Sequence, residues 1–416
     1  MNYGLIGEKL PHSFSGLIHG KIADYDYELK ELKKSELEGF MLAKDFRAIN
    51  VTIPYKKEII KYLDEISPSA EKIGAVNTIV NKNGKLIGYN TDFLGLKSLI
   101  KKNGVSLNGK TVLILGSGGT SLTALAVCED MGAREIKRVS RTEKENCITY
   151  GDLPEYYQAD VIINTTPVGM YPDTDSSPID LSLFKNLEAV FDVIYNPLRT
   201  ELVLQAEELG IKAEGGLYML VAQAVYASEY FLDKKYDESI IEKVYYSLLS
   251  ERENIVLSGM PGSGKSTVGK ILASALNKAF TDTDEEIIKS QKIAISAIFE
   301  QHGEPYFRDL ESKVIKEISH EATGSVIALG GGAVLRNENV KSLKKNGRIY
   351  FLDRNPHDIL PTSDRPLALD REALKKRYDE RIETYIKTCD KQILVDTSAE
   401  GVAEKIRKDY CYEIEN

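Results

Sequence analysis

The chain has 416 residues, of which 42% are apolar and 28% charged, with a formal net charge of −9. This length suggests about two to four domains with enough apolar residues for several cores. An acidic chain without a basic block argues against a nucleic-acid partner, and no segment approaches the ~20 apolar residues of a membrane helix. The four cysteines match no metal-binding spacing, and the N-terminus does not resemble a signal peptide. We therefore expect a cytoplasmic protein.

Residues 1–100 alternate strand-like and helix-like segments, which is the pattern of an α/β domain. The strands are expected at Gly4–Ile6, Tyr25–Leu29, Ala48–Ile53 and Ala75–Val80. Four polar clusters stand at strand ends or turns: His12–Ser15, Asn50–Lys56, Gly74–Thr78 and Gly88–Asp92. Taken singly, such residues are helix caps, turn formers or solvated charges, but residues at strand ends can also converge on one cleft.

A glycine-rich loop follows an apolar strand-like run at Thr111–Ser121, TVLILGSGGTS. This order of strand, tight turn and helix is typical of a dinucleotide-binding unit, in which a pyrophosphate lies at the helix N-terminus. Gly116 permits the turn, and Gly118, followed by Gly119, lets the backbone approach the pyrophosphate. Ser121 stands where a third glycine is usual, and it is small enough for close packing of the helix.

The next strand-like run ends in Ser140, Arg141 and Thr142, with Lys144 nearby. An NAD-preferring site would have Asp or Glu at this point for the ribose 2′-hydroxyl. Arg141 can instead pair with a 2′-phosphate and stack on adenine. We therefore expect NADP(H) as the cofactor, with the alternative that Arg141 is a surface residue.

A second glycine-rich loop follows the apolar run at Asn254, within the segment NIVLSGMPGSGKST. It is a full G-x-x-x-x-G-K-S match, which predicts a loop whose backbone N–H groups bind the phosphates of a nucleoside triphosphate. Lys265 would reach the β- and γ-phosphates and Ser266 would bind Mg²⁺. The nucleotide-binding residues expected here are Gly262, Ser263, Gly264, Lys265, Ser266 and Thr267. The charged segment Tyr236–Glu253 before this loop is helix-like, and we place the junction between the two halves near Ser250–Glu253.

Residues 1–246 resemble the shikimate dehydrogenase family. The four polar clusters are followed in order by Asn164–Met170, Phe191–Pro197 and Gly215–Gln223. The resemblance implies reduction of 3-dehydroshikimate by NADPH, with Lys56 and Asp92 as the catalytic pair, because an ammonium group can stabilise and protonate the developing oxyanion. It further implies substrate contacts from Ser13, Ser15, Thr52, Asn77 and Gln223, and cofactor contacts from Asn164, Thr165 and Met170.

Residues 254–405 resemble the shikimate kinase family. The matching runs are Phe280–Asp284, Glu304–Arg308, Leu329–Ala333, Asp364–Leu367 and Arg377–Tyr385. By this resemblance Asp282 assists the Mg²⁺ shell, Asp284 activates the acceptor hydroxyl, and Arg365 closes on the phosphates from a lid at about 356–369. Shikimate would be held by Arg308, Gly331, Gly332 and Arg381. A second lid arginine of this family is replaced here by the region of His357 and Asp358.

These patterns predict an α/β chain of three domains. They are a substrate domain at 1–100 plus about 217–248, a Rossmann-type NADP domain at 101–216, and an NMP-kinase-like P-loop domain with a parallel sheet at 254–416. Because shikimate is the product of the first reaction and the substrate of the second, we expect a bifunctional enzyme. Two alternatives stay open: a quinate/shikimate oxidoreductase joined to another small-molecule kinase, and a nucleotide-bound sensor. The sequence also leaves monomer and homodimer open.

Overall fold

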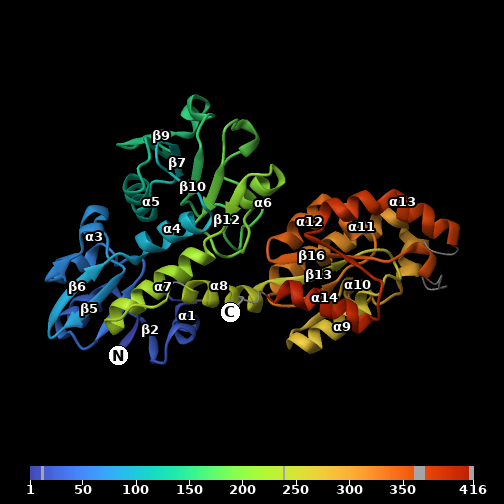
Figure 1. The fold of residues 1–416 in the computed structure, drawn as a ribbon, viewed down its shortest axis with the longest axis horizontal. Helices are drawn as coiled ribbons and strands as arrows, with labels where there is room; N and C mark the ends of the chain where they lie inside the picture. Colours follow the sequence, from blue (N-terminus) through green and yellow to red (C-terminus); the bar gives the residue numbers. More distant parts are fainter. Residues whose placement is uncertain (11–13, 238, 360–370, 412–416) are drawn as a thin grey trace. The chain divides into compact units, whose positions relative to one another are not determined.

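The computed structural model describes residues 1–10, 14–237, 239–359 and 371–411. They form two compact units, unit 1 at Met1–Tyr245 and unit 2 at Tyr246–Asn416 (Figure 1). The segment between the two glycine-rich halves forms helix α8 (Ser239–Arg252), in agreement with its helix-like pattern. Within the described ranges, no helix is long and apolar enough to span a membrane.

The first sheet of unit 1 is mixed, with the strand order β2-β1-β3-β5-β6-β4. The strands are β1 (Tyr3–Gly7), β2 (Tyr27–Glu31), β3 (Ala48–Val51), β4 (Glu65–Ile66), β5 (Thr78–Lys82) and β6 (Lys85–Tyr89). Strand β1 is parallel to β2 and β3, while β5 is antiparallel to β3 and β6. The β5–β6 turn is formed by Asn83 and Gly84, both with positive φ, which is the chemistry of a tight hairpin.

Two predicted strands of this sheet are shifted along the chain. Strand β2 begins at Tyr27 because its register is set by pairing with Tyr3 of β1. Strand β5 begins at Thr78 because Gly74 caps the preceding helix in the left-handed conformation, and the residues after it serve as a connection.

Helix α7 lies near the C-terminal end of unit 1 in sequence and packs against elements from the N-terminal part of that unit. The helices beside the first sheet are α1 (Ser15–Ile22), α2 (Lys34–Ala43), α3 (Pro68–Ile73), α4 (Thr91–Lys102) and the 3₁₀ turn η1 (Glu58–Tyr62). Helix α7 (Leu217–Leu232) packs against α4, α1 and strands β3 and β5 (Figure 1). Gly95 makes the α4–α7 approach possible, because a Cβ at this position would lie 2.6 Å from the carbonyl oxygen of Met219. This packing brings Gln223 to the first residues of α4.

The second sheet of unit 1 has the order β12-β11-β10-β7-β8-β9, and every neighbouring pair is parallel. Its strands are β7 (Thr111–Leu115), β8 (Glu135–Ser140), β9 (Cys147–Thr149), β10 (Val161–Asn164), β11 (Ala189–Asp192) and β12 (Lys212–Glu214). The helices are α5 (Gly119–Asp130) and α6 (Glu201–Glu208), with 3₁₀ turns η2 (Tyr150–Tyr156) and η3 (Leu181–Leu183). The fully buried runs of β7, β10 and β11 are typical of a parallel sheet covered on both faces.

Unit 2 is built on a parallel sheet of order β14-β15-β13-β16-β17. The strands are β13 (Asn254–Ser258), β14 (Phe280–Asp282), β15 (Val326–Ala328), β16 (Gly347–Asp353) and β17 (Lys391–Leu394). The helices are α9 (Lys265–Leu276), α10 (Thr283–Gln291), α11 (Ile295–Glu321), α12 (Asn337–Lys344), α13 (Arg371–Thr388) and α14 (Ala399–Tyr410), with 3₁₀ turns η4 (Ala333–Leu335) and η5 (Pro356–Asp358). Helix α11 is broken at Gly303, and Pro305 starts its second part, which places Arg308 in a first helical turn.

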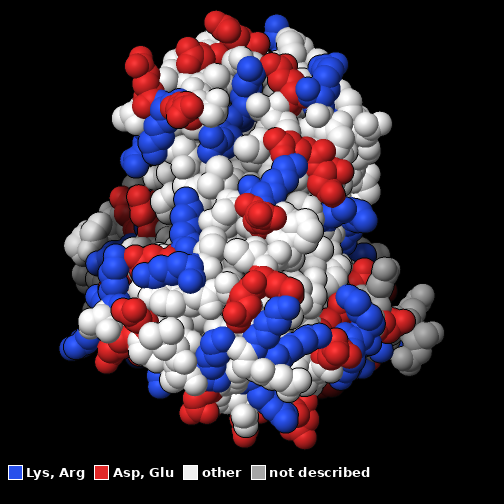
Figure 2. Space-filling view, turned by 90° about the vertical axis from the view of Figure 1, so that its left-hand side faces the viewer, with Lys and Arg blue, Asp and Glu red and all other residues white. Residues whose placement is uncertain are grey.

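The charged residues follow the mixed composition of the chain. On the face shown in Figure 2, Lys and Arg side chains are interspersed with Asp and Glu, and neither sign covers a broad area of the described surface. This face therefore offers no broad positive surface for an anionic ligand.

Candidate active sites

The predicted catalytic pair of unit 1 forms a close ion pair. The Nζ atom of Lys56 donates to Oδ2 of Asp92 at 2.7 Å. The backbone of Lys56 is fixed because its carbonyl accepts from the N–H of Val76 at 2.8 Å. Asp92 lies in the first turn of α4, whose N-cap is the side chain of Asn90. An acid–base pair of this kind can orient an ammonium group toward a substrate oxygen.

A hydrogen-bond network extends from this pair into the sheet. Asn77 is buried, and its side-chain oxygen accepts from the backbone N–H of Thr91 at 2.7 Å and from the hydroxyl of Thr78 at 3.1 Å. The hydroxyl of Thr91 also reaches Oε1 of Gln223 at 3.4 Å. Because the oxygen of Asn77 is fully used, its amide N–H₂ is the group left for a ligand.

The Lys56–Asp92 pair lines a cleft of ≈ 280 Å³. The structure brings together there the predicted residues Ser15, Thr52, Lys56, Asn77, Asp92 and Gln223. Ser13 lies outside the described residues. The lining residues that carried no role in the sequence analysis include Asn50, which accepts from the hydroxyl of Tyr27 at 2.8 Å, and Tyr195, which packs edge-on against Phe14. Both stand inside runs that matched the dehydrogenase family, which was the signal available for them.

The first glycine-rich loop has the expected strand–turn–helix geometry. Gly116 has φ of 112°, and a Cβ there would lie 2.7 Å from Oγ1 of Thr165. A Cβ at Gly118 or Gly119 would meet no atom within 4 Å, so the backbone at the start of α5 is open to a bound group. Ser121, at the usual third glycine, is buried and donates to the carbonyl of Gly118 at 2.6 Å. This open helix N-terminus fits a pyrophosphate.

The residues predicted to read the 2′-phosphate lie beside this loop. The Nζ atom of Lys144 donates to Oγ of Ser117 at 2.9 Å, and Ser117 in turn lies 3.4 Å from the hydroxyl of Ser140. Ser140 also accepts from the backbone N–H of Thr142. Arg141 is exposed next to them. A cation and hydroxyls within one loop suit a phosphate group.

Asn164, Thr165 and Met170 have different environments. Asn164 is fully buried and donates to both carboxylate oxygens of Asp192 at 3.1 Å, while its own oxygen accepts from Thr166. Its side chain is therefore committed to the protein, and its backbone carbonyl accepts from the N–H of Val193 at 3.1 Å. Thr165 lies directly under Gly116, and Met170 is exposed. Burial raises the pKa of the Asp192 carboxyl to about 6, although these hydrogen bonds oppose the shift.

The second glycine-rich loop forms the phosphate-binding geometry expected of it. Lys265 is buried, and its Nζ atom donates to the carbonyls of Gly259 at 2.9 Å and Met260 at 3.0 Å. The hydroxyl of Ser263 is buried without a hydrogen-bond partner among the described residues. A Cβ at Gly264 would meet no atom within 4 Å. An open loop with an unsatisfied hydroxyl and a buried ammonium group fits the phosphates of ATP.

A magnesium site is indicated where α9 meets strand β14. The hydroxyl of Ser266 donates to Oδ2 of Asp282 at 2.6 Å. Mg²⁺ takes hard oxygen ligands and usually keeps waters and substrate phosphates in its shell, so one hydroxyl and one carboxylate are sufficient. No larger cluster of acidic, histidine or cysteine ligands occurs in the part of the chain that the structure describes.

The predicted acceptor residues meet around the loop after β15. Asp284 lies in the first turn of α10, where its N–H is capped by Asp282. A Cβ at Gly332 would lie 2.4 Å from the terminal nitrogens of Arg308. Arg381 and Tyr385 of α13 both donate to the carbonyl of Gly331, the former at 3.1 Å. Arg365 lies outside the described residues.

Glu311 belongs to this cluster but was missed by the sequence analysis. It is buried and accepts from Nη1 of Arg308 at 2.7 Å, and Glu304 pairs with the same guanidinium at 2.9 Å. Its Oε1 atom has no partner among the described residues and faces Gly330 together with Asp284. Burial, reinforced by the charge of Asp284, raises the pKa of the Glu311 carboxyl. The i,i+3 spacing from Arg308 was the only sequence signal.

These sites define an α/β enzyme with two centres, an oxidoreductase centre beside a dinucleotide-binding sheet and a phosphotransferase centre on a P-loop. Comparison with known proteins gives the families. A family model of the shikimate dehydrogenase substrate binding domain matches residues 5–79, and a model of shikimate kinase matches residues 261–411.

Among relatives, the chain is 39% identical over 264 residues to a shikimate dehydrogenase (NADP(+)) of Clostridium perfringens, covering 59% of this chain and 97% of that protein. Among solved structures, shikimate dehydrogenase 1 of Peptoclostridium difficile is 40% identical with a TM-score of 0.54, covering 60% of this chain and 98% of that one. The Thermus thermophilus enzyme, solved in complex with NADP(H) and shikimate, is 29% identical with a TM-score of 0.54, covering 59% and 99%.

The chain therefore belongs to the shikimate dehydrogenase family through its N-terminal part and carries a shikimate kinase domain in its C-terminal part. It is a bifunctional enzyme of the shikimate pathway that uses NADP and ATP.

Proposed function

We propose that unit 1 reduces 3-dehydroshikimate to shikimate at the Lys56–Asp92 cleft, and that unit 2 phosphorylates shikimate at the site of Asp284. The assignment extends to three domains: a substrate domain at 1–100 plus about 217–248, an NADP domain at 101–216 and a kinase domain at 254–416. The free cysteines are consistent with work in the cytoplasm. The observation that carries the proposal is the 2.7 Å ion pair between Lys56 and Asp92 in a cleft of polar side chains.

In unit 1, NADPH supplies the hydride when bound. The carbonyl oxygen of the substrate gains negative charge as the hydride arrives, and the ammonium group of Lys56 stabilises it and donates a proton. Asp92 keeps that ammonium group oriented. Ser15, Thr52, Asn77 and Gln223 offer hydroxyl and amide groups that suit the carboxylate and ring hydroxyls of a small polyol acid.

In unit 2, ATP would supply the phosphoryl group when bound, and Mg²⁺ would neutralise the charge of its phosphates. Asp284 orients the acceptor hydroxyl and takes up its proton. Lys265, on the phosphate loop, stabilises the charge that develops during transfer, and we assign the same task to Arg365. Arg308 and Arg381 provide guanidinium groups for the carboxylate of shikimate, which they can bind bidentately.

A set of parallel reaction mixtures tests the proposal. The purified chain is incubated with 3-dehydroshikimate, Mg²⁺ and either NADPH, ATP or both, and the products are identified by mass spectrometry. We expect shikimate with NADPH alone, shikimate 3-phosphate with both cofactors, and no product with ATP alone. Parallel reactions with quinate and NADP⁺ test the quinate alternative. Absence of any product would refute both activities and favour a nucleotide-bound sensor.

A further inference from the structure

Helix α13 presents one row of residues to the glycine loop of unit 2. Arg377, Arg381 and Tyr385 are each four residues apart, so they lie on one face of the helix. Tyr385 and Arg381 both donate to the carbonyl of Gly331. The face that carries Arg377 is therefore the face turned toward the proposed acceptor site.

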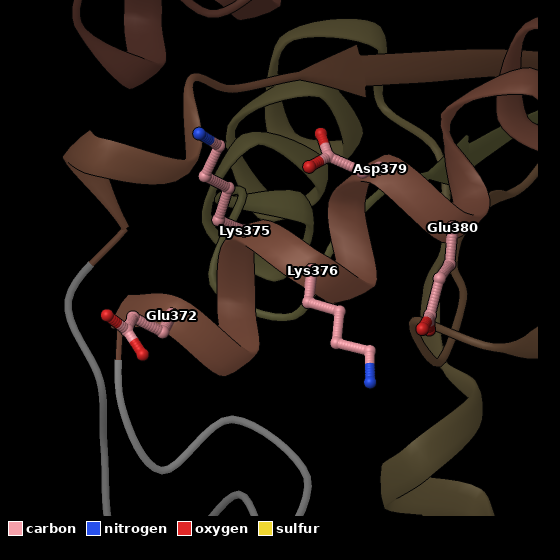
Figure 3. Close-up of a pocket in the computed structure, with 5 residues that line it drawn as sticks. All are labelled: Glu372, Lys375, Lys376, Asp379 and Glu380. Carbon is pink, nitrogen blue, oxygen red and sulfur yellow. The ribbon is translucent and has the colours of Figure 1, made fainter.

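The neighbouring rows of α13 have a different character. Figure 3 shows Glu372, Lys375, Lys376, Asp379 and Glu380, which leave the helix in several directions and line a pocket of ≈ 520 Å³. Three of the five are acidic and two are basic. Because the charges of this pocket nearly cancel, it offers no anion site, in contrast to the row with the two arginines.

Arg377 has an unsatisfied buried nitrogen. Its Nη1 atom is excluded from solvent and has no hydrogen-bond partner among the described residues. Burial lowers the pKa of the Arg377 guanidinium, and the neighbouring charge of Arg381 lowers it further, although the charges of Glu304 and Glu380 oppose the shift. A buried guanidinium nitrogen without an acceptor, next to a second cation, is unfavourable for the protein alone. An anion placed between the two guanidinium groups would relieve both penalties.

The charge balance of the cluster points to the same ligand. Arg308 is already paired with the carboxylates of Glu304 and Glu311. Across the described residues, Arg381 and Arg377 make no ion pair within 4 Å. The positive charge available for an incoming carboxylate therefore comes mainly from Arg377 and Arg381, and Arg308 is positioned by its two carboxylates.

We propose that Arg377 is a further substrate-binding residue of the kinase, which binds the carboxylate of shikimate together with Arg381 and selects the acid over neutral ring analogues. This inference rests on the proposed function of unit 2. It adds a third guanidinium to the two that sequence resemblance assigned to the acceptor.

The test compares Arg377→Met and Arg377→Lys with Lys376→Met, an exposed lysine on the same helix. The full chain is assayed for ADP formation without NADP(H), so that only the kinase reports. The KM for shikimate and for MgATP is measured, together with the inhibition constant of methyl shikimate, a neutral analogue. Shikimate oxidation by NADP⁺ at unit 1 normalises the amount of chain in each sample, and an unchanged KM for MgATP checks that unit 2 of each variant is folded.

Loss of one charge-assisted pair predicts a rise of about ten- to a hundredfold in the KM for shikimate in Arg377→Met. In the same variant, the inhibition constant of methyl shikimate and the KM for MgATP should change less than twofold. Arg377→Lys should show a smaller rise in the KM for shikimate, and Lys376→Met should resemble the wild type. If Arg377→Met weakened the binding of shikimate and of methyl shikimate equally, Arg377 would have a structural role and the inference would be overturned. An unchanged KM for shikimate, or a rise in the KM for MgATP alone, would also overturn it. A wild-type chain that fails to phosphorylate shikimate would instead overturn the proposed function, and the inference with it.

Discussion

Replacing Gly332 by alanine tests whether the position of Arg308 matters for the kinase. The backbone of Gly332, with φ of −112° and ψ of −1°, accepts an alanine without strain. The added Cβ would lie 2.4 Å from both terminal nitrogens of Arg308 and 2.5 Å from its Cζ atom. Ordinary contact is about 3.5 Å, so the guanidinium group must retreat by about 1 Å.

This retreat should reduce activity without unfolding the chain. The guanidinium group is the end of a flexible side chain, but it is held by Glu311 at 2.7 Å and Glu304 at 2.9 Å, so it moves away from its present position only by distorting these pairs. A misplacement of about 1 Å in a positioning group can cost roughly 100-fold in rate. We therefore expect kcat/KM for shikimate to fall about 100-fold in Gly332→Ala.

The assay is ADP formation at varied shikimate and saturating MgATP, with shikimate oxidation at unit 1 measured on the same sample. Gly39→Ala is the matched control, because it adds the same methyl group to helix α2, where no atom lies within 4 Å. We expect unit 1 activity and the control to be unchanged. If Gly332→Ala kept kcat/KM for shikimate within twofold, Arg308 would not contact the substrate and the acceptor site would be wrongly assigned.

Three further predictions concern unit 1. Lys56→Met should lower the rate of reduction, read from NADPH absorbance, by about 10²- to 10⁴-fold and leave the kinase activity unchanged. Lys57→Met, which changes the exposed neighbour, should have no effect on either rate. Equal losses in both variants would refute the role of Lys56. Arg141→Leu should raise the KM for NADPH about tenfold or more and leave that for NADH unchanged; an equal rise for both would show that Arg141 does not bind the 2′-phosphate. Burial raises the pKa of Asp192 from 3.8 to about 6. Between these two values the native state keeps a proton that the unfolded state releases. The free energy of unfolding of unit 1 should therefore fall by up to about 3 kcal/mol as the pH rises from 4 to 6. Calorimetry at several pH values, with the transition of unit 1 identified by its shift with NADP⁺, should show this slope reduced in Asp192→Asn, and an unaltered slope would contradict the assignment.

Much of the fold follows from local pattern. The two strand–glycine–helix loops were predictable because the apolar runs before Gly116 and Gly259 are continuous, as buried parallel strands are. The start of β2 was not predictable, because that strand is polar and lies at the sheet edge, where pairing with β1 rather than its own side chains sets the register. The antiparallel orientation of β5 likewise depends on its pairing with a strand distant in sequence, β3.

The catalytic pair shows what resemblance adds to pattern. Lys56 and Asp92 are 36 residues apart, and neither their spacing nor their type would bring them together without the known family. Asn164 shows the opposite case. Its position in a matched run suggested a cofactor contact, which stays a prediction. Its side chain donates to the buried carboxylate of Asp192, as do the hydroxyl of Thr200 and the backbone N–H of Ile194, because a buried carboxylate without donors is costly.

The sequence does not show which partners surround each arginine of unit 2 in the folded chain. Arg308 and Arg381 are equally charged in sequence, yet Arg308 is held by two carboxylates and Arg381 by a backbone carbonyl. The difference arises because α11 carries acidic residues four positions before and three positions after Arg308, whereas α13 carries none at these spacings from Arg381. A guanidinium that is already neutralised positions a substrate, whereas one bonded only to a carbonyl keeps its charge for an anion. The assignment of binding roles among the arginines of unit 2 therefore depends on their partners, and the substitution at Arg377 measures that dependence directly.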